Sequence, residues 1–190
     1  MPAERAYVPG MSPPALMTAD ELLYVRMPDQ RVELVSGRLV VREPAGGRHG
    51  SVTVNLTIRL GAHVERTGAG QLFAAETGFT LARGPDTVRA PDIAFIGRER
   101  IPEPVPAGFL DVIPDLAVEV LSPGDRPGEV LGKVADWLSA GCGLVWVIDP
   151  ERRLARVYRH DGSEAFLTAD DVLDGEDVVP GFSCPLGAVL

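Results

Sequence analysis

The chain has 190 residues, of which 45% are hydrophobic and 24% charged, and its formal net charge is -9. This length and composition predict one globular domain with a buried core, and the acidic balance argues against a protein that coats nucleic acid without sequence preference. No apolar run approaches the roughly 18 residues of a membrane span, and the N-terminal segment lacks the pattern of a signal peptide. We therefore expect a cytoplasmic protein that does not associate with membranes.

The N-terminal residues 1–16 hold four of the 17 prolines and show no hydrophobic period, which predicts a disordered lead-in. A single domain is expected over residues 17–190. Thr18 and Glu21 have the spacing of a capping box, which predicts a helix that begins there and runs to Pro28.

Apolar patterns in the next part of the chain predict a hairpin, a helix and two strands. Residues 32–43 contain two short apolar runs around a Ser-Gly pair, which is typical of a hairpin. Apolar residues recur every fourth position from 50 to 68, as in an amphipathic helix. Two strands are expected at 71–82 and 87–96, and a proline-rich loop follows at 97–114.

The sequence from 115 to 149 predicts a βαβ unit. A mostly apolar run at 115–122 indicates a buried strand, 128–141 indicates a helix closed by a glycine, and 143–150 indicates a second buried strand. The two strands should be parallel neighbours in one sheet. Short strands and turns are expected in the remaining tail. Of the two cysteines, which we expect to be reduced thiols, Cys142 should be buried at the end of the helix.

Two acidic residues interrupt apolar strands: Asp92 in APDIAFI and Glu119 in LAVEVLS. A carboxylate in such a run is costly unless it is paired or bound to a cation. One interpretation pairs each acid with a nearby arginine, such as Arg89, or exposes it at a strand end. If the two strands are neighbours, the carboxylates could instead share one divalent cation through oxygen ligands.

Lys133 is the only lysine among the 18 Lys and Arg residues. Glu129 lies four residues before it, so one interpretation is an exposed ion pair on a helix surface. Lys133 also falls at the margin of the apolar face of its helix, next to Trp137, from where its flexible stem could reach the two carboxylates. A compact ammonium can position a water or neutralise a phosphate more readily than the wide fork of arginine.

The proline-aspartate pair at 91–92, followed by a strand that carries Glu119, resembles the PD-(D/E)XK nuclease superfamily. Within it, RVELVSGRLV, RAPDIAFI, PDLAVEVLSP, the helix with its lysine and AGCGLVWVIDP resemble the Uma-type family of restriction-endonuclease-like proteins. The resemblance extends from about Thr18 to the last strands. It implies an α/β fold, with a mixed central sheet flanked by helices, and a nuclease that hydrolyses DNA phosphodiester bonds with Mg²⁺ or Mn²⁺.

Residue by residue, the resemblance implies that Asp92 and Glu119 bind the metal, together with a backbone carbonyl from Val120. The superfamily places its lysine two residues after the second acid, where this chain has Leu121. Sequences of the Uma type carry the lysine on the following helix, which matches Lys133.

Other polar residues are weaker candidates for the site. Glu33 matches an acidic position near the metal, but it could equally be a half-exposed strand residue that pairs with Arg31 or Arg38. His49, just before the expected second helix, could contact a phosphate or simply start that helix. Glu76 is interpreted as a structural strand residue.

Asp115 forms a second proline-aspartate pair, which offers an alternative metal ligand. It lies four residues before Glu119 on the same expected strand, about 13 Å away at about 3.3 Å per residue, which is too far to share one ion. Asp92 is therefore preferred.

Two other functions stay open. A catalytically inert interaction or regulatory module on the same fold is favoured by the acidic charge and by Leu121. A glycosidase-like acid and base pair is disfavoured by the low aromatic content of 6%. The sequence does not decide between DNA and RNA, nor the oligomeric state, a homodimer included.

Overall fold

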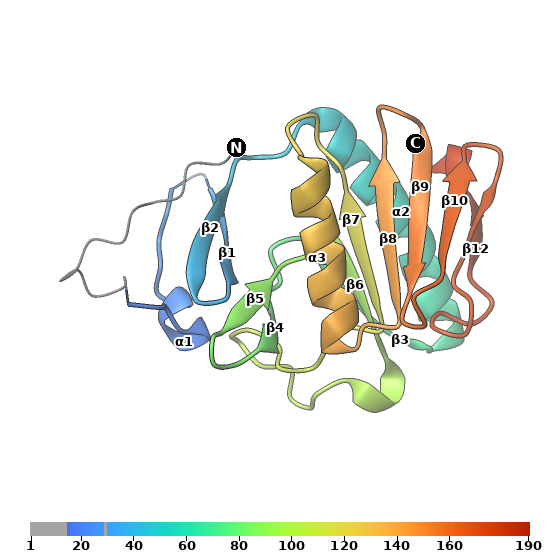
Figure 1. Ribbon diagram of the computed structural model, residues 1–190. Coiled ribbons are helices and arrows are strands. Elements are labelled where there is room, and N and C mark those ends of the chain that lie inside the picture. The colour runs from blue at the N-terminus through green and yellow to red at the C-terminus, as the bar shows by residue number, and fades with distance from the viewer. Residues whose placement is uncertain (1–14, 29) are drawn as a thin grey trace.

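The computed structural model describes residues 15–28 and 30–190 (Figure 1). The expected lead-in over 1–16 therefore lies almost wholly outside the described residues. Within them, no helix is long and apolar enough to cross a membrane. The helical segments are α1 (Ala19–Leu22), α2 (Gly47–Thr67), α3 (Pro127–Ala140) and the short 3-10 turns η1 (Arg98–Arg100) and η2 (Leu186–Ala188). The strands are β1 (Arg31–Val35), β2 (Arg38–Arg42), β3 (Gly70–Ala74), β4 (Phe79–Ala82), β5 (Thr87–Arg89), β6 (Ile93–Gly97), β7 (Leu116–Val120), β8 (Leu144–Asp149), β9 (Leu154–Arg159), β10 (Glu164–Thr168), β11 (Val172–Asp174) and β12 (Ser183–Pro185).

The strands form a six-stranded sheet, a four-stranded sheet and a separate hairpin. The six-stranded sheet has the order β10-β9-β8-β7-β6-β3, the four-stranded sheet has the order β2-β1-β5-β4, and β11 pairs with β12. In the larger sheet β7 and β8 are parallel and the other neighbours are antiparallel. The expected mixed α/β architecture is confirmed.

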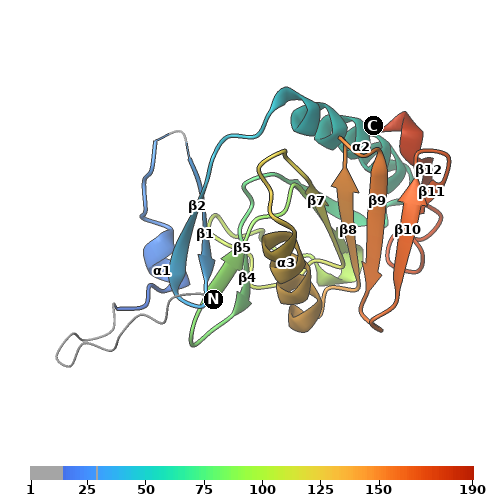
Figure 2. The same ribbon diagram turned by 45° about the horizontal axis from the view of Figure 1, so that its top comes forward.

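Two helices cover the larger sheet from opposite sides (Figures 1 and 2). The apolar stripe of α2, which includes Leu56 and Leu60, packs in one core cluster with Phe95 and Trp146. On the other face, Trp137 of α3 belongs to a second core cluster. The smaller sheet stands beside α3, so α3 borders both sheets.

The local predictions are confirmed where the pattern is strongest. The Thr18 capping box is present with both of its hydrogen bonds. Ser36 and Gly37 have φ values of 48° and 72°, as a tight two-residue hairpin turn requires. The helix and strands of the βαβ unit form as expected, with the left-handed Gly141 closing α3.

Three predicted boundaries are wrong. The first helix ends at Leu22 rather than Pro28, because the N–H groups of Tyr24 and Val25 turn back to carbonyls three residues earlier. Each of the strands expected at 71–82 and 87–96 is divided in two, because the chain passes there between the sheets: β3 and β6 belong to the larger one, β4 and β5 to the smaller.

Candidate active site

Asp92 lies where the chain crosses from the smaller sheet to the larger one, immediately before β6. Its backbone N–H donates to the carbonyl of Val118 at 3.0 Å, and its Oδ2 accepts from the N–H of Val120 at 2.8 Å. Both partners are on β7, on either side of Glu119. The two expected strands are neighbours, since β6 pairs with β7 and Glu119 is on β7, although Asp92 itself stands one residue before β6.

The carboxylate of Asp92 is buried and faces two basic groups. His49 Nε2 lies 3.1 Å and Arg31 Nη1 lies 3.4 Å from Oδ1. Burial alone would raise the pKa of Asp92, but the hydrogen bond and charge of His49, the N–H of Val120 and the charge of Lys133 lower it below its ordinary value. His49 is in the first turn of α2 rather than before it, because the helix begins at Gly47.

Glu119 is almost fully buried and is held from α3. Its Oε2 lies 2.6 Å from Lys133 Nζ, and its Oε1 accepts from the indole N–H of Trp137 at 3.0 Å. Lys133 and Trp137 are one helical turn apart, so α3 presents both donors to the same carboxylate. Burial raises the pKa of Glu119, and the charges of Asp92 and Glu33 raise it further against the opposing effect of Lys133.

Lys133 carries its positive charge into this buried cluster. Burial opposes the ammonium form, but the charges of Glu119, Glu33 and Asp92 together outweigh burial and raise the pKa of Lys133. The interpretation that Lys133 forms an exposed ion pair with Glu129 is wrong. Among the described residues, Lys133 pairs with Glu119, and Glu129 pairs with Arg42 at 2.8 Å.

Glu33 is buried in the smaller sheet, where β1 lies between β2 and β5. Its Oε2 accepts from Arg89 Nη1 at 2.9 Å, and its Oε1 accepts from the N–H of Ala90 at 3.2 Å. Arg89 in turn reaches Asp136 on α3 at 2.6 Å. The expectation that Glu33 is half-exposed and pairs with Arg31 or Arg38 is therefore wrong. Glu33 anchors the segment that leads into Asp92.

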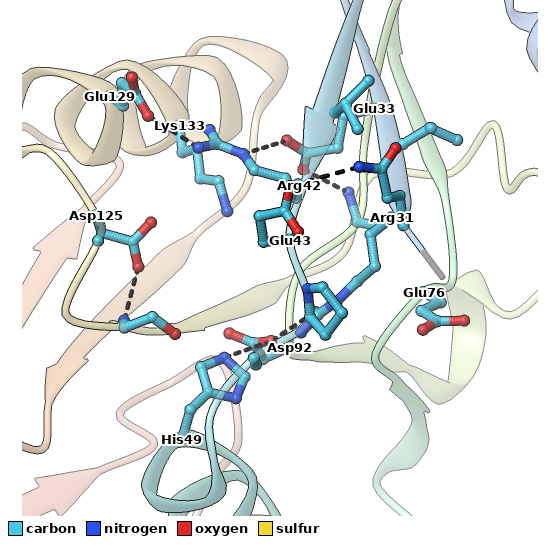
Figure 3. A pocket seen from close by; sticks show the side chains of 18 of the residues that line it. Arg31, Glu33, Arg42, Glu43, His49, Glu76, Asp92, Asp125, Glu129 and Lys133 are labelled. Atoms are coloured by element: carbon cyan, nitrogen blue, oxygen red, sulfur yellow. Dashed lines mark hydrogen bonds and ion pairs between the residues drawn. The ribbon is translucent and has the colours of Figure 1, made fainter. Parts of the chain in front are cut away.

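A cleft of about 860 Å³ opens beside these groups, and Figure 3 shows the side chains of 18 of the residues that line it. Its walls come from the β1–β2 hairpin, the first turn of α2, the loop at 122–126 and α3. Asp92, His49 and Lys133 line the cleft, whereas Glu119 is not in the lining. The charged side chains around the cleft are Arg26, Arg31, Glu33, Arg42, Glu43, Glu76, Asp92, Asp125, Arg126, Glu129 and Lys133.

Two further acids, Glu76 and Asp115, were considered in the sequence analysis, and neither belongs to this cluster. Glu76 is in a turn with φ of 74°, exposed at the rim of the cleft, rather than in a strand. Asp115 precedes β7 and accepts from the N–H of Gly97, so it lies at the other end of β7 from Glu119.

The residues present fit a hard divalent cation. Across residues 15–28 and 30–190, no group of three or more His, Cys, Asp or Glu side chains is arranged to hold a metal ion. Mg²⁺ does not require such a group, because it commonly takes one or two carboxylates and completes its shell with water and substrate phosphates. Asp92 offers a carboxylate that lines the cleft and Glu119 offers a buried second one, and carboxylate oxygens are donors that Mg²⁺ and Mn²⁺ accept.

Trp137, Arg31 and Arg42 were not assigned to the site from the sequence. Trp137 could have been found, because it stands one turn after Lys133 on a predicted helix. Arg31 and Arg42 could not, because 17 arginines are spread along the chain and none of the patterns singles these two out.

Comparisons with known proteins agree with this architecture. The model of the Uma2 family, described as "Putative restriction endonuclease", matches residues 20–187. A solved structure, "a putative nuclease belonging to DUF820 from Anabaena variabilis", superposes with a TM-score of 0.80 at 21% identity, covering 91% of this chain and 97% of that one. At this identity the likeness shows the fold alone. No curated protein matches the chain.

Proposed function

The chain belongs to the Uma2 family of restriction-endonuclease-like proteins, and from this premise we propose that it hydrolyses DNA phosphodiester bonds with Mg²⁺ or Mn²⁺. The observation that carries the proposal is the Lys133–Glu119 contact of 2.6 Å beside the buried carboxylate of Asp92. An ammonium and two carboxylates from neighbouring elements are the groups that metal-assisted hydrolysis of a phosphodiester uses.

Asp92 and Glu119 would hold the cation, with the backbone carbonyl of Val120. The bound cation would polarise the phosphodiester and lower the pKa of the attacking water. Burial, and after it the charges of Asp92 and Glu33, raise the pKa of Glu119, which supports this assignment because such a carboxylate gains from additional positive charge.

Lys133 would act on the water and the phosphate. Its ammonium lines the cleft while Glu119 holds it in place. From there it can orient the attacking water, or stabilise negative charge that develops on the phosphoryl oxygens. Its compact shape suits a position between a carboxylate, a water and a phosphate oxygen.

Glu33, His49 and Arg31 would act through Asp92. Both oxygens of Glu33 are engaged by the segment that leads into Asp92, while His49 and Arg31 contact the Asp92 carboxylate. Glu33 is thus assigned a positioning role.

The test is cleavage of single-stranded DNA, duplex DNA and RNA in Mg²⁺ or Mn²⁺, with and without a chelator. Wild type should cut DNA only with the metal, and Asp92→Asn and Glu119→Gln should not cut. If the wild type cuts none of these substrates, the nuclease proposal is refuted. An interaction module on the same fold would then account better for the family resemblance.

A further inference from the structure

An ion pair between Arg42 and Glu129 spans the cleft. Arg42 ends β2 in the hairpin of the smaller sheet, and Glu129 lies in the first turn of α3 on the other side, with 2.8 Å between Arg42 Nη1 and Glu129 Oε2 (Figure 3). Both residues line the same cleft as Lys133. The side chains are 27% and 44% exposed, so the pair is accessible to solvent and to a ligand.

The guanidinium of Arg42 is incompletely satisfied. Its Nε is buried and has no hydrogen-bond partner among the described residues. The carboxylate of Glu33 is 3.9 Å from it, beyond hydrogen-bond distance, and is already engaged by Arg89. The Nε is closed to solvent, so a ligand can reach this guanidinium only through its terminal nitrogens, which suit the oxygens of a phosphate.

The hairpin places a second arginine opposite Arg42. Arg31 on β1 is its direct partner in the strand register, and both side chains line the cleft. Like charges directly opposite each other in an antiparallel pair are destabilising. In the free protein Asp92 faces Arg31 and Glu129 faces Arg42, and an anion near both guanidinium groups would replace the negative charge that Glu129 supplies.

We infer that Arg42 binds a phosphate of the nucleic-acid substrate and that Glu129 occupies this position in the free protein. The inference rests on the proposed function for the identity of the substrate. Glu129 is a competing anion, and the hydrogen bond and charge of Arg42 lower its pKa below its ordinary value. Since an exposed ion pair contributes little to stability, a phosphate can displace the Glu129 carboxylate from Nη1 of Arg42.

The experiment measures the Kd of a fluorescently labelled single-stranded DNA oligonucleotide by anisotropy, at low salt in a chelator so that no bond is cut. Glu129→Gln should bind about 2- to 5-fold more tightly than wild type, because the competing carboxylate is gone. Arg42→Ala should bind about 10-fold more weakly, because a charge-assisted contact is lost. In the Arg42→Ala background, Glu129→Gln should tighten binding of the oligonucleotide no more than the control variant Glu176→Gln does.

The matched control is Glu176→Gln. Glu176 also pairs with an arginine, Arg159 at 2.7 Å, and neither residue lines the cleft. This change alters the net charge equally, so it reports the non-specific gain from a less acidic protein. If Arg42→Ala fails to fold, Arg42→Lys and the comparison of Glu129→Gln with Glu176→Gln decide the question.

The inference is overturned if Glu129→Gln gains no more than Glu176→Gln, if its excess gain persists without Arg42, or if no variant binds the oligonucleotide. The phosphate contact and the nuclease proposal can be refuted independently of each other. A wild type that shows these affinities and cuts nothing refutes only the nuclease. A wild type that cuts, with Glu129→Gln no tighter than Glu176→Gln, refutes only the phosphate contact.

Discussion

Lys133 Nζ lies 2.6 Å from Glu119 Oε2, although Glu129 stands one turn before Lys133 on the same helix. The side chain of Lys133 points into the protein and is 17% exposed. Glu129 pairs with Arg42 instead. A surface pair would stabilise the helix by only about 0.2–0.5 kcal/mol. The contact with Glu119 instead joins α3 to β7 at the site. Replacing the ammonium of Lys133 with another cationic group therefore tests whether its shape matters for catalysis.

Exchanging this ammonium for a guanidinium should separate catalysis from packing. Lys133→Arg keeps the charge opposite Glu119, so the melting temperature should change little. The wider group cannot sit between the carboxylate, a water and a phosphate, so cleavage of DNA should fall by about 100-fold or more. The control is Arg156→Lys, on β9 outside the cleft, which should cut DNA at the wild-type rate. Cleavage by Lys133→Arg at the wild-type rate would reduce Lys133 to a structural partner of Glu119.

The sequence predicted those parts of the site that depend on local patterns. Asp92 and Glu119 stood out because each interrupts an apolar strand, and the βαβ unit placed Lys133 beside the sheet. These signals are short-range: strand alternation, helical periodicity and turn residues act over a few positions.

The ion pairs that complete the site could not be predicted in the same way. Arg89 and Glu33 are 56 residues apart, and Arg42 and Glu129 are 87 residues apart. Their contacts exist only because the smaller sheet stands beside α3, and no local pattern encodes that packing. The same long-range cause divided the two predicted strands, since the chain changes sheets between Ala74 and Phe79 and again between Arg89 and Ile93.

Removing the charge of Glu33 should mainly cost stability. Arg89 is buried between Glu33 and Asp136, so Glu33→Gln leaves a buried guanidinium with one charged partner fewer. We expect a loss of about 2–4 kcal/mol in the free energy of unfolding, measured in urea. Glu43→Gln, the same change at an exposed position next to the hairpin, should cost little. Unchanged stability together with loss of Mn²⁺ binding would instead make Glu33 a metal ligand.

The buried thiol of Cys142 should make the fold sensitive to alkali. Burial raises the pKa of Cys142 to about 12, whereas a thiol in the unfolded chain ionises near pH 8.5. The folded state therefore binds more protons between these values, so stability should fall as pH rises from about 8.5 toward 12. Unfolding in urea across this range measures the effect, and Cys142→Ala should reduce it. At pH 8 a thiol reagent should label Cys142 only after unfolding; rapid labelling of the native protein would contradict its burial.

Metal binding can be measured without any nucleic acid. Mn²⁺ at about 100 times its Kd should stabilise the wild type by about 2.7 kcal/mol, because an ion that binds only the folded state shifts the unfolding equilibrium. Thermal unfolding with and without Mn²⁺ should show this as a higher melting temperature.

The same titration tests which carboxylates hold the ion. Asp92→Asn and Glu119→Gln each remove one anionic ligand, so each should weaken Mn²⁺ binding by about 10-fold or more in calorimetry. Asp115→Asn is the matched control, because Asp115 belongs to the second proline-aspartate pair and lies at the far end of β7, where it binds the N–H of Gly97. It should bind Mn²⁺ like the wild type even if its melting temperature is lower. If Asp92→Asn binds the ion as tightly as wild type while Asp115→Asn does not, the metal site lies at the opposite end of the strand and the assignment of Asp92 is wrong.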